Sequence, residues 1–279
     1  MIARRILPLL LLPGLLPRRA VAQRRLPVVG FVGFGSAAAD RPSVTAFREG
    51  MRSQGMIEGQ GWQLDHRHAD GDAMRGAAII RELTALPVDV FIVPGPSAAR
   101  AVRRATAIPL VAIGLPPVRS DPELFATLAR PGGTVTGFAS FGEEMSAKRI
   151  EFLREIIPGL GTIGVLHNAA DPTSDAWGRL SEASARAQGL AVQRLPLAQR
   201  DPAVLAAAMA ALRGEGGRAL VVVRDFLTSS LIAEIIATAQ AEGIAVIGDQ
   251  ARFAEAGALF SYGANVCTAE GKSATVAAA

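Results

Sequence analysis

Residues 128–138 read Leu128-Ala129-Arg130-Pro131-Gly132-Gly133-Thr134-Val135-Thr136-Gly137-Phe138, near the middle of a chain of 279 residues. Pro131 and the two glycines after it predict a turn, because proline fixes φ and glycine accepts positive φ. The β-branched run at 134–136 favours an extended strand, and Gly137 lets the backbone bend directly after it. We interpret this stretch as a crossover between two halves of the chain. The alternative is a loop followed by an edge strand of one large sheet.

The two halves of the chain alternate apolar strands with helical patterns. The strands expected before the central stretch are 27–33, 62–68, 88–93 and 109–113. Those expected after it are 162–167, 190–195, 219–223 and 244–247. Strands that alternate with helices predict parallel sheets covered by helices on both faces. The expected fold class is therefore α/β, with two Rossmann-like lobes of parallel sheet joined by a hinge.

Composition and charge describe a globular chain. Apolar residues make up 50% and charged residues 19% of the sequence. The formal net charge is +4, but residues 1–22 hold four arginines and no acid, which leaves 25 basic against 25 acidic residues. The remaining chain therefore gives no net-charge support for a nucleic-acid partner. Cys267 is the only cysteine, which excludes an internal disulfide and a cysteine-rich metal site.

Residues 1–22 predict a secretory signal peptide. Arg4 and Arg5 form its positive end, and residues 6–16 form an apolar segment that is too short to span a bilayer. Ala20-Val21-Ala22 supplies small residues for signal peptidase, so we expect cleavage after Ala22 and a periplasmic product. The alternative is an uncleaved membrane anchor, because Arg18-Arg19 between the apolar segment and the cleavage site is atypical.

Two local motifs suggest a cofactor or a metal, but both favour a structural interpretation. Residues 33–38 match a loose GxGxxA dinucleotide fingerprint, yet the helix is expected only from Pro42 and the second strand ends without an acid. His66 and His68 share one face of a strand, but no third ligand can be identified. We therefore expect no cofactor and no metal.

A ligand site is expected where the two lobes face each other, because open parallel sheets bind ligands beyond the carboxyl ends of their strands. The strand-exit loops that would line this cleft are 33–36, 94–97 and 114–117 in the first lobe and 168–171, 224–226 and 248–250 in the second. Ser36 and Ser97 are predicted to bind an anionic group, helped by backbone N–H groups at helix starts. Asp225 either caps a helix or binds a ligand amine or hydroxyl, and both roles are compatible.

Four phenylalanines at strand exits, Phe34, Phe138, Phe141 and Phe226, are predicted to form apolar walls of the cleft. The complete set of predicted ligand-binding residues is Phe34, Gly35, Ser36, Gly95, Ser97, Gly114, Leu115, Phe138, Phe141, Asn168, Asp225 and Phe226.

The central stretch and several other segments resemble the ABC-transporter substrate-binding proteins of the tryptophan/aromatic-amino-acid-binding-like family. The resemblance covers about residues 27–265, and its most specific part is 128–137. It implies the type I periplasmic-binding-protein fold, with two hinged lobes that close on a small molecule and deliver it to a membrane permease without catalysis. The other matching segments are Val29-Gly30-Phe31, Phe47-Arg48-Glu49-Gly50-Met51, Glu58-Gly59-Gln60, Val88-Asp89-Val90, Ile108-Pro109-Leu110-Val111, Lys148-Arg149-Ile150-Glu151, Ile157-Pro158-Gly159-Leu160 and Ser261-Tyr262-Gly263-Ala264-Asn265.

The sequence departs from this family pattern in two places. Gly-Asp-Pro-Val usually follows the fourth strand, whereas this chain reads Gly114-Leu115-Pro116-Pro117-Val118, which puts the ligand class in doubt. After Asn265 the family continues into a helix, whereas residues 266–279 give an atypical tail, which we expect to be disordered after a truncation. The expected domains are a signal peptide at 1–22, an N-terminal lobe at 23–137 with 258–265 near the return crossover, a C-terminal lobe at 138–257, and the tail.

The leading functional hypothesis is a periplasmic solute receptor of an ABC importer, which binds an amino acid or an aromatic or organic acid. An enzyme on two α/β lobes, such as a racemase or isomerase, is the alternative, but the cleft offers neither two cysteines nor an identifiable acid–base pair. A cytoplasmic regulator is a third hypothesis, which the export signal disfavours. We expect a monomer whose partners are the ligand and the permease, with no nucleic acid.

Overall fold

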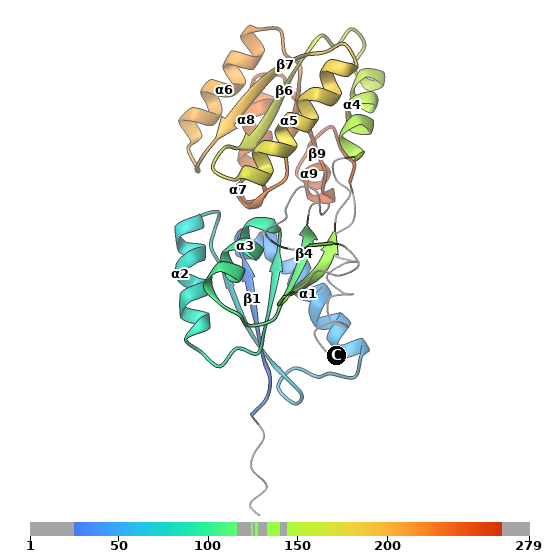
Figure 1. Cartoon of the computed structure of the whole chain (residues 1–279). Helices are drawn as coiled ribbons and strands as arrows, with labels where there is room; N and C mark the ends of the chain where they lie inside the picture. The colour runs from blue at the N-terminus through green and yellow to red at the C-terminus, as the bar shows by residue number, and fades with distance from the viewer. Residues whose placement is uncertain (1–24, 116–123, 125, 128–132, 140–143, 264–279) are drawn as a thin grey trace, which may run out of the picture.

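The computed structural model describes residues 25–115, 124, 126–127, 133–139 and 144–263. These residues form two α/β lobes, stacked one above the other in Figure 1. Each lobe has a five-stranded parallel sheet, with strand order β2-β1-β3-β4-β5 in the first and β10-β9-β8-β6-β7 in the second. The predicted fold class, two lobes of parallel sheet, is confirmed. The predicted signal peptide and the tail at 266–279 lie outside the described residues.

The first lobe buries both faces of its sheet. Helix α1 covers one face, where Phe31, Phe47 and Trp62 are at most 1% exposed, and α2 and α3 cover the other, where Leu83 and Phe91 are fully buried. Figure 1 shows α1 and α2 on opposite sides of this sheet. Its elements are β1 (Val28–Gly33), α1 (Ala37–Ser53), β2 (Gln63–His68), α2 (Ala73–Thr84), β3 (Val90–Pro94), α3 (Pro96–Ala105), β4 (Leu110–Leu115) and β5 (Val135–Ala139).

The second lobe repeats this architecture. Helices α6 and α8 pack through Met209 and Ile235 on one face of the sheet, and α4 and α5 pack through Leu153 and Ala185 on the other. The elements are α4 (Glu144–Ile156), β6 (Thr162–Asn168), α5 (Pro172–Ala187), β7 (Ala191–Leu197), α6 (Pro202–Gly214), β8 (Ala219–Val222), α7 (Phe226–Ser230), α8 (Ile232–Ala241), β9 (Ala245–Gly248), α9 (Ala251–Glu255) and β10 (Phe260–Ser261).

The central stretch includes an edge strand, as the alternative interpretation expected, but the strand belongs to one of two sheets and not to one large sheet. Residues of β5 pair in parallel with β4, from Leu110 opposite Val135 to Ile113 opposite Phe138, so β5 is the edge strand of the first sheet. The next described element, α4, already belongs to the second lobe. Strand β10 pairs with β9, so Phe260–Ser261 extend the second sheet.

The start of α1 differs from the prediction, which placed it at Pro42. The helix begins at Ala37, directly after Ser36, whose Oγ accepts a hydrogen bond from the backbone N–H of Ala39 at 3.2 Å. Pro42 therefore lies inside the helix rather than at its first position. The prediction was wrong because proline favours a helix start, whereas here the serine cap sets it. No helix in the described part of the chain is long and apolar enough to cross a membrane.

Candidate functional site

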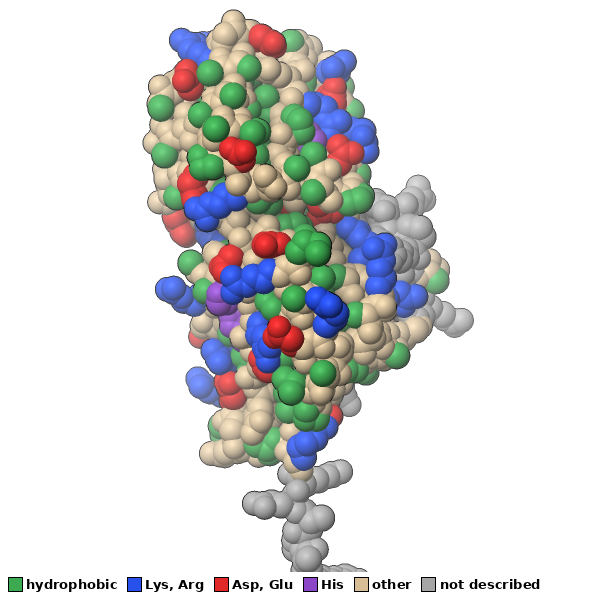
Figure 2. All heavy atoms as spheres, turned by 90° about the vertical axis from the view of Figure 1, so that its left-hand side faces the viewer, with side chains coloured by type: hydrophobic (Ala, Val, Ile, Leu, Met, Phe, Trp, Pro, Cys, Tyr) green, Lys and Arg blue, Asp and Glu red, His purple; other side chains and the backbone are tan. Residues whose placement is uncertain are grey.

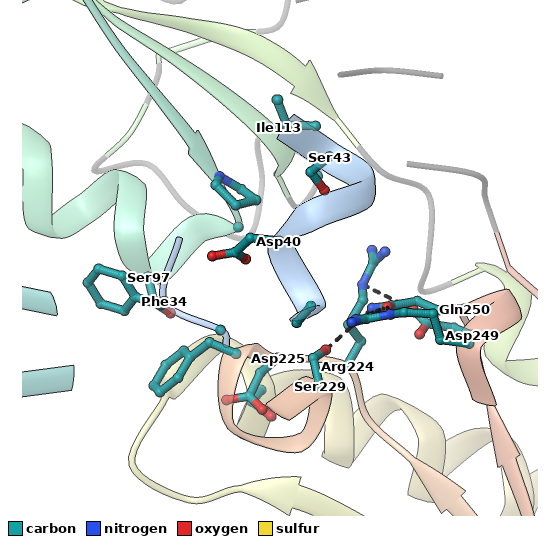
Figure 3. A pocket seen from close by; sticks show the side chains of 18 of the residues that line it. Phe34, Asp40, Ser43, Ser97, Ile113, Arg224, Asp225, Ser229, Asp249 and Gln250 are labelled. Atoms are coloured by element: carbon teal, nitrogen blue, oxygen red, sulfur yellow. Dashed lines mark hydrogen bonds and ion pairs between the residues drawn. The ribbon is translucent and has the colours of Figure 1, made fainter. Parts of the chain in front are cut away.

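A cavity of about 520 Å³ lies between the two lobes, at the carboxyl ends of their strands (Figure 3). The first lobe contributes the β1–α1 loop, the first turns of α1, the β3–α3 loop and the end of β4. The second lobe contributes the start of α5, the β8–α7 loop and residues 249–252. The volume falls within the range of small-molecule sites, about 300–1,000 Å³.

Aromatic and apolar side chains from both lobes form part of the wall. The rings of Phe34 and Phe226 meet edge to face across the lobes, with their centroids 5.5 Å apart. Phe34 can occupy this place because Gly76 lies beneath it, where an added Cβ would be 2.6 Å from the ring. Trp177 and Ile113 also line the cavity. These surfaces suit an apolar portion of a ligand.

Asp225 lines the cavity and also begins helix α7. Its Oδ1 accepts from the backbone N–H of Thr228 at 2.8 Å, and the Thr228 Oγ1 accepts from the Asp225 N–H at 3.0 Å, which completes a capping box. The Nδ2 of Asn168 donates to Oδ2 of the same carboxylate. Burial raises the pKa of Asp225 to about 6, although the Thr228 and Asn168 donors oppose that shift. The cap and the cavity-facing position occur together, as the sequence allowed.

A buried ion pair crosses between the lobes beside the cavity. Arg100 of α3 donates through Nη2 to Oδ1 of Asp171 at 3.1 Å, and the Ser97 hydroxyl donates to Oδ2 of Asp171. The Arg100 and Asp171 side chains are only 14% and 5% exposed. Asp171 also caps α5 by accepting from the N–H of Thr173 at 2.9 Å. We call Ser97, Arg100 and Asp171 the interlobe latch.

The second lobe holds another ion pair at the cavity wall, between Arg224 Nε and Asp249 Oδ2 at 3.1 Å. Figure 3 shows this pair beside Gln250, whose Nε2 donates to Ser229 at 3.4 Å. Elsewhere on the molecule, basic and acidic side chains are interspersed over both lobes on the face shown in Figure 2. That face offers no continuous basic stripe of the kind that binds nucleic acid.

The structure brings seven of the predicted ligand-binding residues to the cavity and leaves others outside its wall. Ser36 caps α1, Leu115 is buried, Phe138 is partly buried in β5, and Asn168 is fully buried and reaches the cavity only through Asp225. Phe141 lies outside the described residues. The seven that line the cavity are Phe34, Gly35, Gly95, Ser97, Gly114, Asp225 and Phe226.

The anion-binding role predicted for two serines is not supported by this geometry. The Ser97 hydroxyl has one hydrogen, which it donates to Asp171, and Ser36 does not line the cavity. Sequence reasoning also missed Asp40, Ser43 and Trp177, which lie on helices that face the cleft. For Asp40 the signal was the cap at Ser36, which places Asp40 in the first turn of α1.

The β1–α1 loop has the position of a dinucleotide fingerprint, but its surroundings are unsuitable for phosphate. A Cβ added to Gly33 would lie 1.7 Å from Oδ2 of Asp40, so a carboxylate already packs against this glycine. A negative group here would repel the phosphate that such loops bind at a helix start. Among the described residues, no cluster of three or more His, Cys, Asp and Glu side chains has an arrangement that would hold a metal ion.

A family model for ABC transporter substrate binding proteins matches residues 30–279. The chain belongs to this family. The match runs through 266–279, beyond the point where the sequence resemblance was expected to end. A substrate-binding protein of ABC transporters is a non-enzymatic component, and the cavity between two lobes is where such a protein would hold its small ligand. No curated protein matches the chain by sequence.

Solved structures share the type I periplasmic-binding-protein fold of this family member. A conserved domain protein from Vibrio cholerae has a TM-score of 0.82 at 22% identity, covering 91% of this chain and 84% of its own. An ABC domain from Streptococcus pneumoniae in complex with L-Trp has a TM-score of 0.81 at 19% identity, covering 91% and 85%. A ligand-free, open substrate-binding protein from Clostridium difficile has a TM-score of 0.58 at 22% identity, covering 91% and 85%.

The raised pKa of Asp225 predicts a pH dependence of stability. With a folded pKa of about 6 and an ordinary aspartate pKa of about 3.9 in the unfolded chain, the folded state binds more protons between about pH 4 and 6. Asp225 should therefore add stability as the pH falls from 7 to 5. Denaturant unfolding at both pH values should show a larger gain in wild type than in Asp225→Asn. An equal gain in stability for wild type and Asp225→Asn would contradict the raised pKa of Asp225.

Proposed function

We propose that this family member is the periplasmic receptor of an ABC importer and binds a small organic molecule, an amino acid or an aromatic or organic acid, between hinged lobes. The observation that carries the proposal is the cavity, because its wall comes from both lobes and is complete only when they are together. A ligand that contacts both lobes favours the closed arrangement over an open one. Closure would present the loaded receptor to a membrane permease.

The ligand-binding residues of this proposal combine apolar walls with a polar end. Phe34, Phe226 and Trp177 would contact an apolar or aromatic portion of the ligand. Oδ2 of Asp225 accepts from Asn168 and has a second lone pair for a ligand amine or hydroxyl. The similar structure from Streptococcus pneumoniae contains L-Trp, which supports an amino acid as the ligand.

The enzyme alternative finds less support in the cavity. A racemase or isomerase needs an acid and a base placed on the two sides of its substrate. The histidines in the described chain, His66, His68 and His167, do not line the cavity. Desolvation and the nearby Arg194 lower the pKa of His167. This buried histidine is therefore favoured in its neutral form.

Solution scattering of the exported protein tests the proposal. We expect the mature chain to begin at Gln23, as read by mass spectrometry, and to bind a member of a panel of amino acids and small organic acids in a thermal-shift screen. The radius of gyration should fall when that compound is added, because the lobes close. A binding compound that leaves the radius unchanged would contradict hinge closure, and a protein that retains residues 1–22 in the membrane would contradict export.

A further inference from the structure

Asp40 is a buried carboxylate at the cavity wall that has no arginine or lysine partner in the described chain. It lies in the first turn of α1 with a residue exposure of 5% and lines the cavity. Its Oδ2 accepts no hydrogen bond. Figure 3 shows the carboxylate projecting from α1 into the space beside Phe34 and Ser97. A buried acceptor without a donor is costly, so such a group in a native protein calls for an explanation.

The surrounding structure supplies only weak compensation for this charge. The nearest basic group is His66, whose Nε2 is 3.8 Å from Oδ2, too far for a hydrogen bond, and this nitrogen is itself buried without a partner. The amino end of α1 favours a negative group, but that effect is small and does not replace a direct donor. Gly33, which has no Cβ, leaves the space in which the carboxylate lies.

The other acidic side chains of the cavity differ from Asp40 in their partners. Asp171 pairs with Arg100, and Asp249 pairs with Arg224. Asp225 accepts hydrogen bonds from Thr228 and Asn168. Glu255 is exposed to solvent. Asp40 therefore differs from the other buried acids of the described cavity wall in having no arginine partner and no hydrogen-bond donor at Oδ2, and a cation that enters the cavity would supply its counter-charge.

We propose that Asp40 is the anchor in the first lobe for a cationic nitrogen of the ligand, which makes this receptor selective for amine-bearing solutes, such as amino acids, over organic acids. The inference rests on the proposed receptor function and decides between its two ligand classes. An ammonium group carries three donors and a full positive charge, so it can neutralise this carboxylate from the cavity. An organic acid would place a second negative charge beside a buried carboxylate, which is unfavourable.

Matched sets of ligands test this selectivity. The panel holds apolar amino acids together with their decarboxylated amines and their deaminated acids, for example phenylalanine, phenethylamine and 3-phenylpropionate, and neutral sugars as a further arm. Calorimetry on the mature protein should show that the amine-bearing members bind at least about tenfold more tightly than the matched acids. Asp40→Asn should weaken amine binding by at least about tenfold and remove most of this preference.

The stability of the variant separates a ligand anchor from a structural residue. Removing an unneutralised buried charge should leave the denaturation midpoint of ligand-free Asp40→Asn equal to or above that of wild type, whereas loss of a structural contact would lower it. Glu82→Gln is the control, because it removes a carboxylate from the exposed surface of the same lobe, where Glu82 pairs with Arg67. It should change neither affinity nor preference.

Other binding results would contradict the role of Asp40. Unchanged amine affinity in Asp40→Asn, or acids that bind as tightly as their amines, would overturn the role of Asp40 and leave the receptor function standing. The same holds if only acids or sugars bind and close the lobes. If no member of any arm binds, both the receptor proposal and the role of Asp40 are contradicted for these ligand classes.

Discussion

Replacing Gly137 with alanine is expected to destabilise the protein by about 3 kcal/mol or more, the upper end of the usual cost of overpacking. Gly137 lies in β5, where a Cβ would be 1.8 Å from the carbonyl oxygen of Ala112 in β4. Backbone atoms in a paired strand cannot rotate away as a side chain can, so β5 would have to move off the sheet. This loss would affect the edge strand that leads from the first lobe into the second.

Denaturant unfolding measures this effect, with Gly161→Ala as the control. An added Cβ at Gly161 would meet no atom within 4 Å, so that variant should stay within about 0.5 kcal/mol of wild type. If the Gly137→Ala protein unfolds at the same denaturant concentration as wild type and Gly161→Ala, then β5 accommodates the methyl group. The close approach to Ala112 would then not be a constraint.

Replacing Asp171 with asparagine is expected to open the lobes. The asparagine keeps an acceptor for the N–H of Thr173 and a similar shape, but it removes the negative charge that Arg100 approaches at 3.1 Å from the other lobe. Removing the charge of one partner of a buried ion pair has an energetic cost. The lobes can avoid most of that cost by separating, which exposes Arg100 to water. The variant should therefore have a larger ligand-free radius of gyration and bind its ligand at least about tenfold more weakly.

Asp201→Asn is the matched control for the latch. Asp201 caps α6 just as Asp171 caps α5, and each is followed by a proline, but Asp201 is not part of the contacts between the lobes. Scattering should give the Asp201→Asn protein the wild-type radius. If Asp171→Asn also keeps the wild-type radius and affinity, the latch does not contribute to closure.

The sequence predicted those features that depend on neighbours along the chain. Apolar runs located β1, β3 and β8 to within a few residues. The cleft segments followed from the rule that parallel strands bind ligands at their carboxyl ends. The sequence also allowed Asp225 to cap a helix at the cleft, and Asp225 both caps α7 and lines the cavity.

The features that were missed depend on residues far apart in the chain. Ser97 follows a strand end, where a serine can bind an anionic ligand. Its hydroxyl instead donates to Asp171 in the other lobe, 74 residues away in the sequence. Asp40 was overlooked because a proline within α1 suggested a later start for the helix. Periodicity cannot show which acids receive a counter-ion, because that depends on side chains that meet only after both lobes have folded.

The capping box at Asp225 has a consequence for how this receptor can diversify. Asp225 caps α7 and lines the cavity, so changing it for a new specificity also removes a helix cap, at about 0.5–2 kcal/mol. Natural proteins have little stability in reserve against such losses. Asp40 caps no helix and accepts no hydrogen bond at Oδ2, so its replacement by a side chain of similar size removes neither a cap nor a hydrogen bond to Oδ2. Descendants of this protein would acquire new ligands more readily through position 40 than through position 225.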